Sequence, residues 1–164
     1  MRTILLIIVL VLLLSGCGTQ PPRDGHTRDG LKLELTANSA CVEPNGTLEV
    51  YLTLTNTTNA AIPFAPLPEM KIFSGPGTRR PGLAEYYWHE SADYPSTFPE
   101  TLLPGEAIKY TWTWQVDPDY AHAAIPTNHG VSNYMTVQVD IADSVHRDPM
   151  GARLVLDYKK LAKC

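Results

Sequence analysis

From Leu31 onward the chain repeatedly alternates apolar and polar residues with a period of two, which is the period of a β-strand with one buried face. The alternation is clearest over residues 31–36, 48–55, 108–116, 135–141 and 152–159, and shorter candidates lie at 70–73 and 84–89. A helix buried on one face needs a period near 3.6, and no segment after residue 16 shows it convincingly. The pattern therefore predicts an all-β fold of about seven strands.

The strand predicted over residues 108–116 defines its own buried face. Large apolar side chains occupy every second position, at Ile108, Tyr110, Trp112, Trp114 and Val116. The positions between them carry Lys109, Thr111, Thr113 and Gln115. Because a slip of one residue would expose all five large side chains, we expect the apolar face to lie in the core.

Turn sequences separate the predicted strands. Residues 43–46 read EPNG, 74–77 read SGPG, 80–82 read RPG and 103–106 read LPGE, and these residue types favour turns. Short alternating strands joined by frequent turns are typical of an antiparallel β-sandwich of the immunoglobulin-like type, with a closed barrel as the alternative. The chain of 164 residues has room for one such domain, which we expect to span residues 31–164.

The N-terminus carries a long apolar run. Ile4 to Leu14 are eleven consecutive apolar residues, and Arg2 precedes them. As a helix this run is about 16 Å long, roughly half of a hydrocarbon core about 30 Å thick. It is a poor membrane span and has the proportions of the apolar region of a signal peptide. Residues 1–16 are therefore predicted to be a helical signal peptide.

Leu14-Ser15-Gly16-Cys17 resembles the lipobox of bacterial lipoproteins. The resemblance implies a diacylglyceryl thioether on Cys17, cleavage before this residue, and acylation of the new amino group by a fatty acid such as palmitate. Such chains would anchor the protein permanently at the extracytoplasmic side of the cell membrane. Because Gly18 is not an aspartate, the expected site in a cell with two membranes is the outer one. An ordinary secretory signal is the alternative.

The segment Gly18 to Gly30 reads GTQPPRDGHTRDG and has no apolar periodicity. Its prolines, glycines and balanced charges predict a linker rather than a strand. Residues 17–30 are therefore expected to form a lipidated tether, which as a coil would span roughly 20 Å and lift the domain from the membrane.

Two stretches within Leu31 to Val116 resemble known modules. LTLTNTT at residues 52–58, followed by Ile62-Pro63-Phe64, is similar to the second strand and exit turn of bacterial immunoglobulin-like domains. Leu103-Pro104-Gly105-Glu106, followed by the aromatic strand at 110–114, resembles the BsuPI-type family of intracellular proteinase inhibitors. That resemblance implies an immunoglobulin-like fold and proteinase inhibition, for which the loop Asp117 to Ser132 would be the reactive site.

Cys41 and Cys164 remain as an even pair once Cys17 is lipidated. An exported domain meets an oxidising compartment, so we expect a disulfide bond that fastens the C-terminal end of the chain to the sheet. The alternative is a reactive or metal-binding pair of thiols.

The sequence contains no recognisable catalytic motif, and we predict neither an enzyme nor a bound cofactor or metal. The five histidines form no zinc motif, no serine lies in a nucleophile elbow, and no glycine-rich phosphate loop is present. Two sets of residues stay open as metal ligands: the histidines His122 and His129, and the acidic residues Asp117, Asp119, Asp140 and Asp143. The net charge of −4 offers no basic face to nucleic acid.

Tyr86, Tyr87 and Trp88 put aromatic rings on both faces of a predicted strand. An exposed ring would mark contact with a protein or a carbohydrate, and the alternative is that the three residues cap the core beneath a long loop. The sequence as a whole predicts a membrane-anchored extracytoplasmic lipoprotein whose non-catalytic sandwich binds a protein or a cell-envelope partner. Proteinase inhibition is the alternative function.

Overall fold

The computed structural model describes residues 20–63, 68–74, 85–116, 126–127, 130–131, 134–141 and 150–158. Outside these ranges lie the predicted signal peptide, Cys17, Cys164, Asp143, and most of the loop 117–132 with His122 and His129. Among the described residues, no helix is long and apolar enough to cross a membrane.

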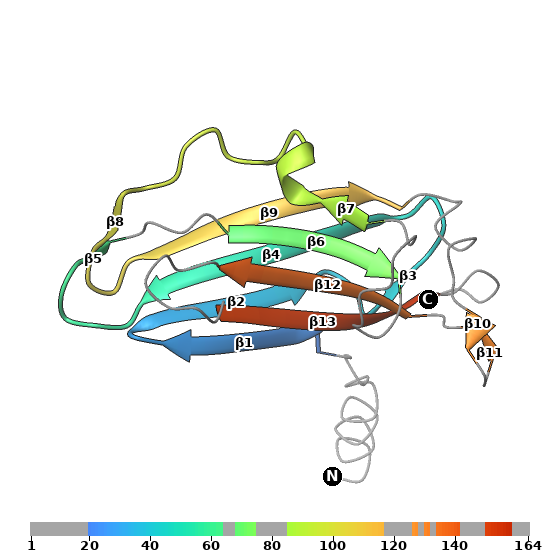
Figure 1. The fold of residues 1–164 in the computed structure, drawn as a ribbon, viewed down its shortest axis with the longest axis horizontal. Coiled ribbons are helices and arrows are strands. Elements are labelled where there is room, and N and C mark those ends of the chain that lie inside the picture. The colour runs from blue at the N-terminus through green and yellow to red at the C-terminus, as the bar shows by residue number, and fades with distance from the viewer. Residues whose placement is uncertain are drawn as a thin grey trace, which may run out of the picture.

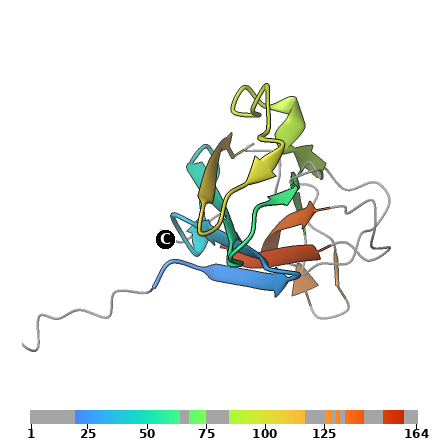
Figure 2. The same cartoon turned by 90° about the vertical axis from the view of Figure 1, so that its left-hand side faces the viewer.

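Two sheets face each other (Figures 1 and 2). The four-stranded sheet has the order β1-β2-β4-β9 and consists of β1 (Arg23–Arg28), β2 (Leu31–Ala37), β4 (Thr47–Asn56) and β9 (Ala107–Gln115). The five-stranded sheet has the order β3-β13-β12-β6-β7 and consists of β3 (Cys41–Val42), β13 (Met150–Tyr158), β12 (Tyr134–Ile141), β6 (Pro68–Ser74) and β7 (Glu85–Tyr87). All pairings are antiparallel except that of β3 with β13.

Two short strand pairs and one 3₁₀ turn complete the described fold. The strands β5 (Ile62–Pro63) and β8 (Thr101–Leu102) pair with each other, as do β10 (Pro126–Thr127) and β11 (Gly130–Val131). A single 3₁₀ turn, η1 (Trp88–Glu90), follows β7.

The core lies between the two sheets and is built from alternate residues of their strands. The four-stranded sheet contributes Leu33, Leu35, Leu48, Val50, Leu52, Leu54, Trp112 and Trp114, and the five-stranded sheet contributes Met70, Ile72, Met135, Val137, Val139, Ile141, Leu154 and Leu156. The seven predicted strands correspond to β2, β4, β6, β7, β9, β12 and β13. The predicted antiparallel β-sandwich is confirmed.

The register of β9 agrees with the prediction. Trp112 and Trp114 are 2% and 7% exposed, whereas Thr111 and Thr113 lie on the solvent side. Trp112 is opposite Val50 of β4, so the apolar faces of neighbouring strands coincide. Burial of one face and solvation of the other explains the alternation from which the strand was predicted.

The prediction that all of residues 17–30 form a linker is wrong. Arg23–Arg28 is strand β1, which pairs with β2 from Arg23↔Thr36 to Arg28↔Leu31. Asp29 and Gly30 join the two strands with φ angles of 50° and 82°. Positive φ at both central residues is the signature of the type I′ hairpin turn, which Asp-Gly favours. The sandwich therefore begins at Arg23, and the pairing starts even earlier, because the Ala37 amide donates to the Pro22 carbonyl at 3.2 Å.

The two stretches that carry the family resemblance pack against each other. The Asn56 side chain is fully buried and donates to the carbonyls of Ala60 and Leu102 at 2.8 and 3.0 Å. The Asn56 main chain accepts from the Gly105 amide and donates to the Glu106 carbonyl, both at 3.0 Å. Gly105 has a φ of 72°, as the tight turn requires. In this chain the two stretches join the end of β4 to the turn that precedes β9.

Candidate functional site

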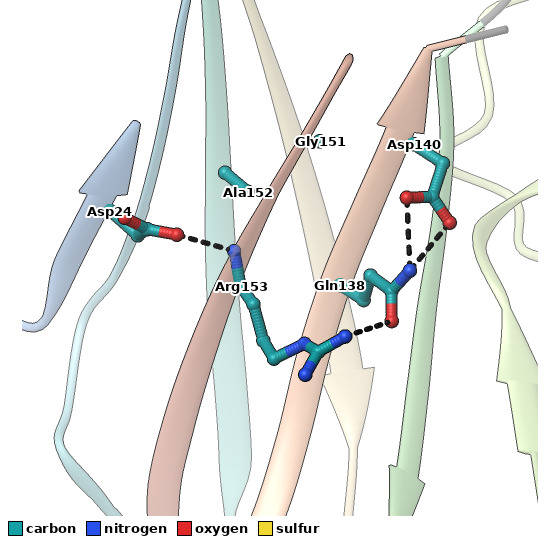
Figure 3. A pocket seen from close by; sticks show the side chains of 6 residues that line it. All are labelled: Asp24, Gln138, Asp140, Gly151, Ala152 and Arg153. Atoms are coloured by element: carbon teal, nitrogen blue, oxygen red, sulfur yellow. Dashed lines mark hydrogen bonds between the residues drawn. The ribbon is translucent and has the colours of Figure 1, made fainter. Parts of the chain in front are cut away.

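A solvent-open groove of about 350 Å³ lies on the outer side of the five-stranded sheet, where β1 runs beside β13. Its lining comes from three strands and both sheets: Asp24 of β1, Gln138 and Asp140 of β12, and Gly151, Ala152 and Arg153 of β13 (Figure 3). Side chains on paired strands are held more rigidly than side chains on loops, so the groove is a preorganised surface.

Gly151 lets the Asp140 carboxylate lie directly against the β13 main chain at the groove. Gly151 is directly opposite Asp140 in the β12–β13 pairing. A Cβ atom at position 151 would lie 2.9 Å from Asp140 Oδ1 and 3.0 Å from the Val139 carbonyl oxygen. A glycine inside a strand often marks a close approach of this kind. Any side chain here would therefore push Asp140 aside and fill the floor of the groove.

Asp24 forms the wall that belongs to the other sheet. Its Oδ2 atom accepts a hydrogen bond from the Arg153 amide at 2.7 Å. Strand β13 pairs with β12 along one side. On its other side β3 pairs only with Asp157 and Tyr158, so β3 does not reach Arg153. Asp24 thus satisfies a backbone donor at the edge of the five-stranded sheet and links the two sheets beside the groove.

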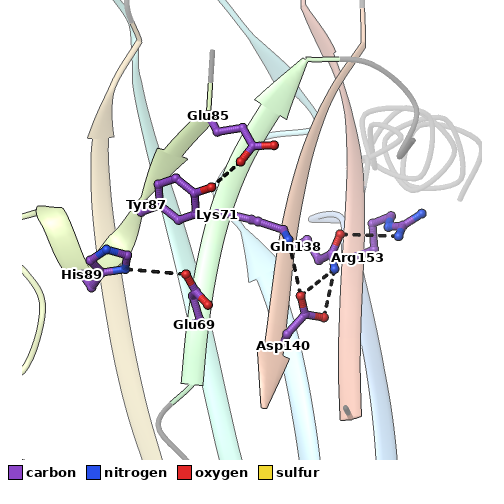
Figure 4. Close-up of polar contacts among 8 residues, drawn as sticks. All are labelled: Glu69, Lys71, Glu85, Tyr87, His89, Gln138, Asp140 and Arg153. Atoms are coloured by element: carbon purple, nitrogen blue, oxygen red, sulfur yellow. Dashed lines mark hydrogen bonds and ion pairs between the residues drawn. The ribbon is translucent and has the colours of Figure 1, made fainter. Parts of the chain in front are cut away.

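A chain of polar contacts crosses three strands at the opposite wall (Figure 4). Arg153 Nη2 donates to Gln138 Oε1 at 3.4 Å, and Gln138 Nε2 donates to both carboxylate oxygens of Asp140 at 2.9 and 2.7 Å. Lys71 Nζ of β6 lies 3.6 Å from Asp140 Oδ2. Only this orientation of the Gln138 amide satisfies Arg153 and Asp140 together, so the network fixes the side chain.

The polar surface continues to the β7 edge of the sheet. Tyr87 is opposite Lys71, and its hydroxyl donates to the Glu85 carboxylate. His89 Nδ1 lies 3.7 Å from Glu69 Oε1. We call the outward side chains of β13, β12, β6 and β7 around these contacts the polar face.

The consecutive aromatic residues do not form one site. Trp88 is fully buried, and its ring lies 5.0 Å from the Tyr94 ring and 5.5 Å from the Tyr110 ring, centroid to centroid. The Tyr86 ring packs on Trp114 at 4.9 Å. These two residues therefore cap the core, in agreement with the alternative, and Tyr87 alone of the three lies on the polar face.

Two buried polar atoms in this aromatic cluster, Trp88 Nε1 and the Tyr110 hydroxyl, have no hydrogen-bond partner among the described residues. Burial raises the pKa of Tyr110, with a smaller electrostatic contribution from Tyr94. The rings fill the open edge of the sandwich between β7 and β9 with tilted and edge-to-face contacts, which is a packing role.

Most of the groove was not predicted from the sequence. Asp24 lies in the predicted linker, the sequence predicts Gln138 and Arg153 only as outward residues of strands, and it offers Asp140 only as a metal ligand. Within the described ranges, no three His, Cys, Asp or Glu side chains are grouped to hold a metal. Gly151 is the sequence feature that could have indicated the groove, because a glycine within a strand often marks a close approach of other atoms.

Cys41 lies in β3, opposite Asp157 at the end of β13. Cys164 follows Asp157 by seven residues and is outside the described ranges. The parallel pairing of β3 with β13 places Asp157, seven residues before Cys164, opposite Cys41. The Cys41–Cys164 bond stays a prediction.

No protein-family model and no curated protein sequence matches this chain. Among solved structures, the C-terminal domain of Wzt is similar with a TM-score of 0.44 and 9% identity, over 88% of this chain and 81% of that one. A beta-glucosidase from Listeria innocua in complex with isofagomine is similar with a TM-score of 0.38 and 12% identity, over 81% of this chain but 17% of that one. Likenesses this distant carry no argument about function.

Proposed function

We propose that this protein is a membrane-anchored extracytoplasmic lipoprotein whose β-sandwich binds a protein or a cell-envelope partner without catalysing a reaction. The lipobox-like residues Leu14 to Cys17 support the anchor. The groove at Gly151 supports binding, because polar side chains from three strands surround an open hollow of small-molecule size.

Binding is tested by photo-crosslinking on intact cells. A photoreactive amino acid replaces Gln138 at the groove, and a matched variant carries it at Thr111 on the outer side of the other sheet. The proposal expects a specific adduct from position 138 that is absent or much weaker from position 111. Equal labelling from both positions, or no adduct from position 138, would refute binding at the groove.

The anchor is tested with Cys17→Ala and metabolic labelling by a fatty-acid analogue. The wild-type protein should carry the label and sediment with membranes, because the thiol of Cys17 is the acceptor that the lipobox resemblance implies. The variant should accumulate as an unlabelled precursor. Label retained by the variant would show that another residue is modified.

The inhibitor alternative gains no support from the described residues. The turn at Gly105, which carries the resemblance to inhibitors, is held by hydrogen bonds to the Asn56 main chain, and most of the loop 117–132 is not described. Incubation of the protein with a panel of bacterial proteases decides between the functions, since inhibition at stoichiometric concentration would favour the alternative.

A further inference from the structure

Strand β1 contributes no side chain to the apolar core. Five of its six side chains are exposed, and only Arg28 is half-buried. Asp24 and His26 lie directly opposite Leu35 and Leu33 of β2, which are fully buried. Residues opposite each other share one face of a sheet, so β1 places polar side chains on the face that is apolar in β2. The hydrophobic effect therefore does little to hold β1 in the sandwich.

Polar contacts hold β1 in place instead. Its main chain pairs with β2, Arg23 forms an ion pair with Glu34, and Asp24 accepts from the Arg153 amide at 2.7 Å. Water can replace each contact when the strand detaches, because β1 lies at the exposed edge of its sheet (Figures 1 and 2). Segments with few buried apolar contacts and exposed hydrogen bonds open before the rest of a fold.

The pairing of β1 with β2 requires a glycine at position 25. A Cβ atom on Gly25 would lie 2.7 Å from the Leu33 carbonyl oxygen, closer than such atoms normally approach. A side chain here would push β1 away from β2 without replacing any residue of the core. Gly25→Ala is therefore a substitution that weakens the attachment of β1 alone.

Detachment of β1 changes the groove, because Asp24 forms the wall that belongs to the four-stranded sheet. Figure 3 shows the Asp24 side chain reaching from β1 to the Arg153 main chain. We propose that β1 is a detachable strand that opens while the rest of the sandwich stays folded, and that its opening removes one wall of the groove and weakens binding there. This inference rests on the proposed function, to which it adds regulation of the same site.

Hydrogen exchange within strand β2 tests the opening. Main-chain hydrogen bonds of a strand between two antiparallel neighbours alternate from one neighbour to the other. Because the Ala37 amide donates to the Pro22 carbonyl, the odd-numbered amides of β2 face β1 and the even-numbered ones face β4. The β1-facing amides to follow are Leu33 and Leu35, and the β4-facing amides are Glu34 and Thr36.

The experiment uses the full-length protein in detergent micelles and measures exchange residue by residue, corrected for intrinsic rates. The β1-facing amides should exchange at least about a hundredfold faster than the β4-facing ones, since they require only that β1 opens. Gly25→Ala should accelerate the β1-facing amides further and leave the β4-facing amides unchanged. Equal rates for both sets in the wild-type protein would overturn the proposal, because β1 would then open only with the whole sandwich.

A disulfide across β1 and β2 supplies the opposite change. Thr27 and Lys32 are directly opposite each other and exchange no main-chain hydrogen bonds. Cα atoms in such pairs are about 4.5 Å apart, which a disulfide can span. Thr27→Cys with Lys32→Cys should slow the β1-facing amides to the rate of the β4-facing ones. Thr53→Cys with Lys109→Cys, an equivalent pair between β4 and β9, is the control and should leave the β1-facing amides fast.

The effect on the groove is measured by photo-crosslinking from position 138 on intact cells. Gly25→Ala should lower the yield of adduct severalfold, and the disulfide between positions 27 and 32 should restore it in the same chain, whereas the control disulfide should not. Unchanged yield despite faster exchange would show that β1 does not govern the groove, and the inference would be wrong. No adduct from position 138 in any variant would refute the proposed function, while exchange would still decide whether β1 detaches. Thermal melting checks that each variant is folded.

Discussion

The two outer faces of the sandwich are both polar, but their side chains are connected differently. On the four-stranded sheet the contacts lie within one strand or join two neighbouring strands: Tyr51 donates to Glu49, Lys32 lies 3.1 Å from Glu34, and Arg23 of β1 pairs with Glu34 of β2. On the five-stranded sheet the contacts join Lys71, Asp140, Gln138 and Arg153 across three strands.

This difference distinguishes a face whose side chains are simply hydrated from a face whose side chains have fixed positions relative to one another. A pair within one strand on an exposed face satisfies itself, as when the Glu49 carboxylate raises the pKa of Tyr51 mainly through their hydrogen bond. Such pairs contribute little to stability and define no shape. The contacts that span β6, β12 and β13 fix side chains relative to one another, and they border the open groove at Gly151. Polarity of a face is thus a poor guide to function, whereas a network of contacts that spans three strands beside a groove is informative.

The four-stranded sheet should have one buried and one solvated face, and two neighbouring residues of β9 test this. Trp112→Ala removes a side chain that is 2% exposed and should destabilise the fold by about 3–5 kcal/mol. Thr111→Ala, its neighbour on the outer face, should change stability by less than about 1 kcal/mol. Urea unfolding measures both. Similar losses would mean that the outer face of the four-stranded sheet is also covered.

The second prediction concerns a covalent bond that would fasten the five-stranded sheet. A Cys41–Cys164 disulfide closes a loop of more than a hundred residues and should contribute about 2–4 kcal/mol. Reduction should lower the melting temperature by several degrees without abolishing the β-sheet signal in circular dichroism. Thiol titration of the unfolded, oxidised protein lacking Cys17 is the direct check. Two free thiols per chain would rule the bond out.

The third prediction concerns the floor of the groove. Gly151→Ala places a Cβ 2.9 Å from Asp140 Oδ1 and should cost about 1–3 kcal/mol through strain, because the crossing network holds Asp140 in place. Thr113→Ala on the opposite outer face has no such crowding and serves as the control. A Gly151→Ala protein as stable as the wild type in urea would show that Asp140 moves freely and that the groove is not rigid.

The smallest expected effect compares two charged surface side chains, Asp24 and Lys32. Asp24→Ala leaves the Arg153 amide without its partner and should cost about 1 kcal/mol. Lys32→Ala breaks a pair within one strand of the other face and should cost no more than about 0.5 kcal/mol. Chemical denaturation with replicate measurements resolves the two. A larger loss from Lys32→Ala would reverse our ranking of the faces.

The strands that alternate apolar and polar residues could be predicted from the sequence, and strand β1, which lacks this alternation, could not. Trp112 and its neighbours reveal their strand because one side is buried and the other is solvated. Strand β1 could not be predicted because most of its residues are exposed at the edge of a sheet. The sequence of a polar edge strand resembles that of a linker. Its turn was nevertheless readable, since Asp29-Gly30 is a typical hairpin pair.

The groove could not be predicted from the sequence for a different reason. Gln138 and Arg153 are outward residues of strands, as Lys109 and Thr111 are, and nothing in one strand says which partners lie across from it. The β12–β13 register and the position of β1 next to β13 bring Asp24, separated from Arg153 by 129 positions, to the same hollow. A site made by pairing is invisible until the pairing is known.

Strand β1 also determines how far the protein can reach. If Cys17 carries the lipid, Asp24 follows it by seven residues, and seven extended residues span at most about 25 Å. The polar headgroup layer takes up roughly 5–7 Å of that distance. A flexible linker of thirteen residues, Gly18 to Gly30, would have allowed the domain to move through a larger volume. With Cys17 lipidated, the paired strand β1 would shorten that linker, and the groove would be confined to a thin layer above the membrane, where it would meet only molecules that come to that surface.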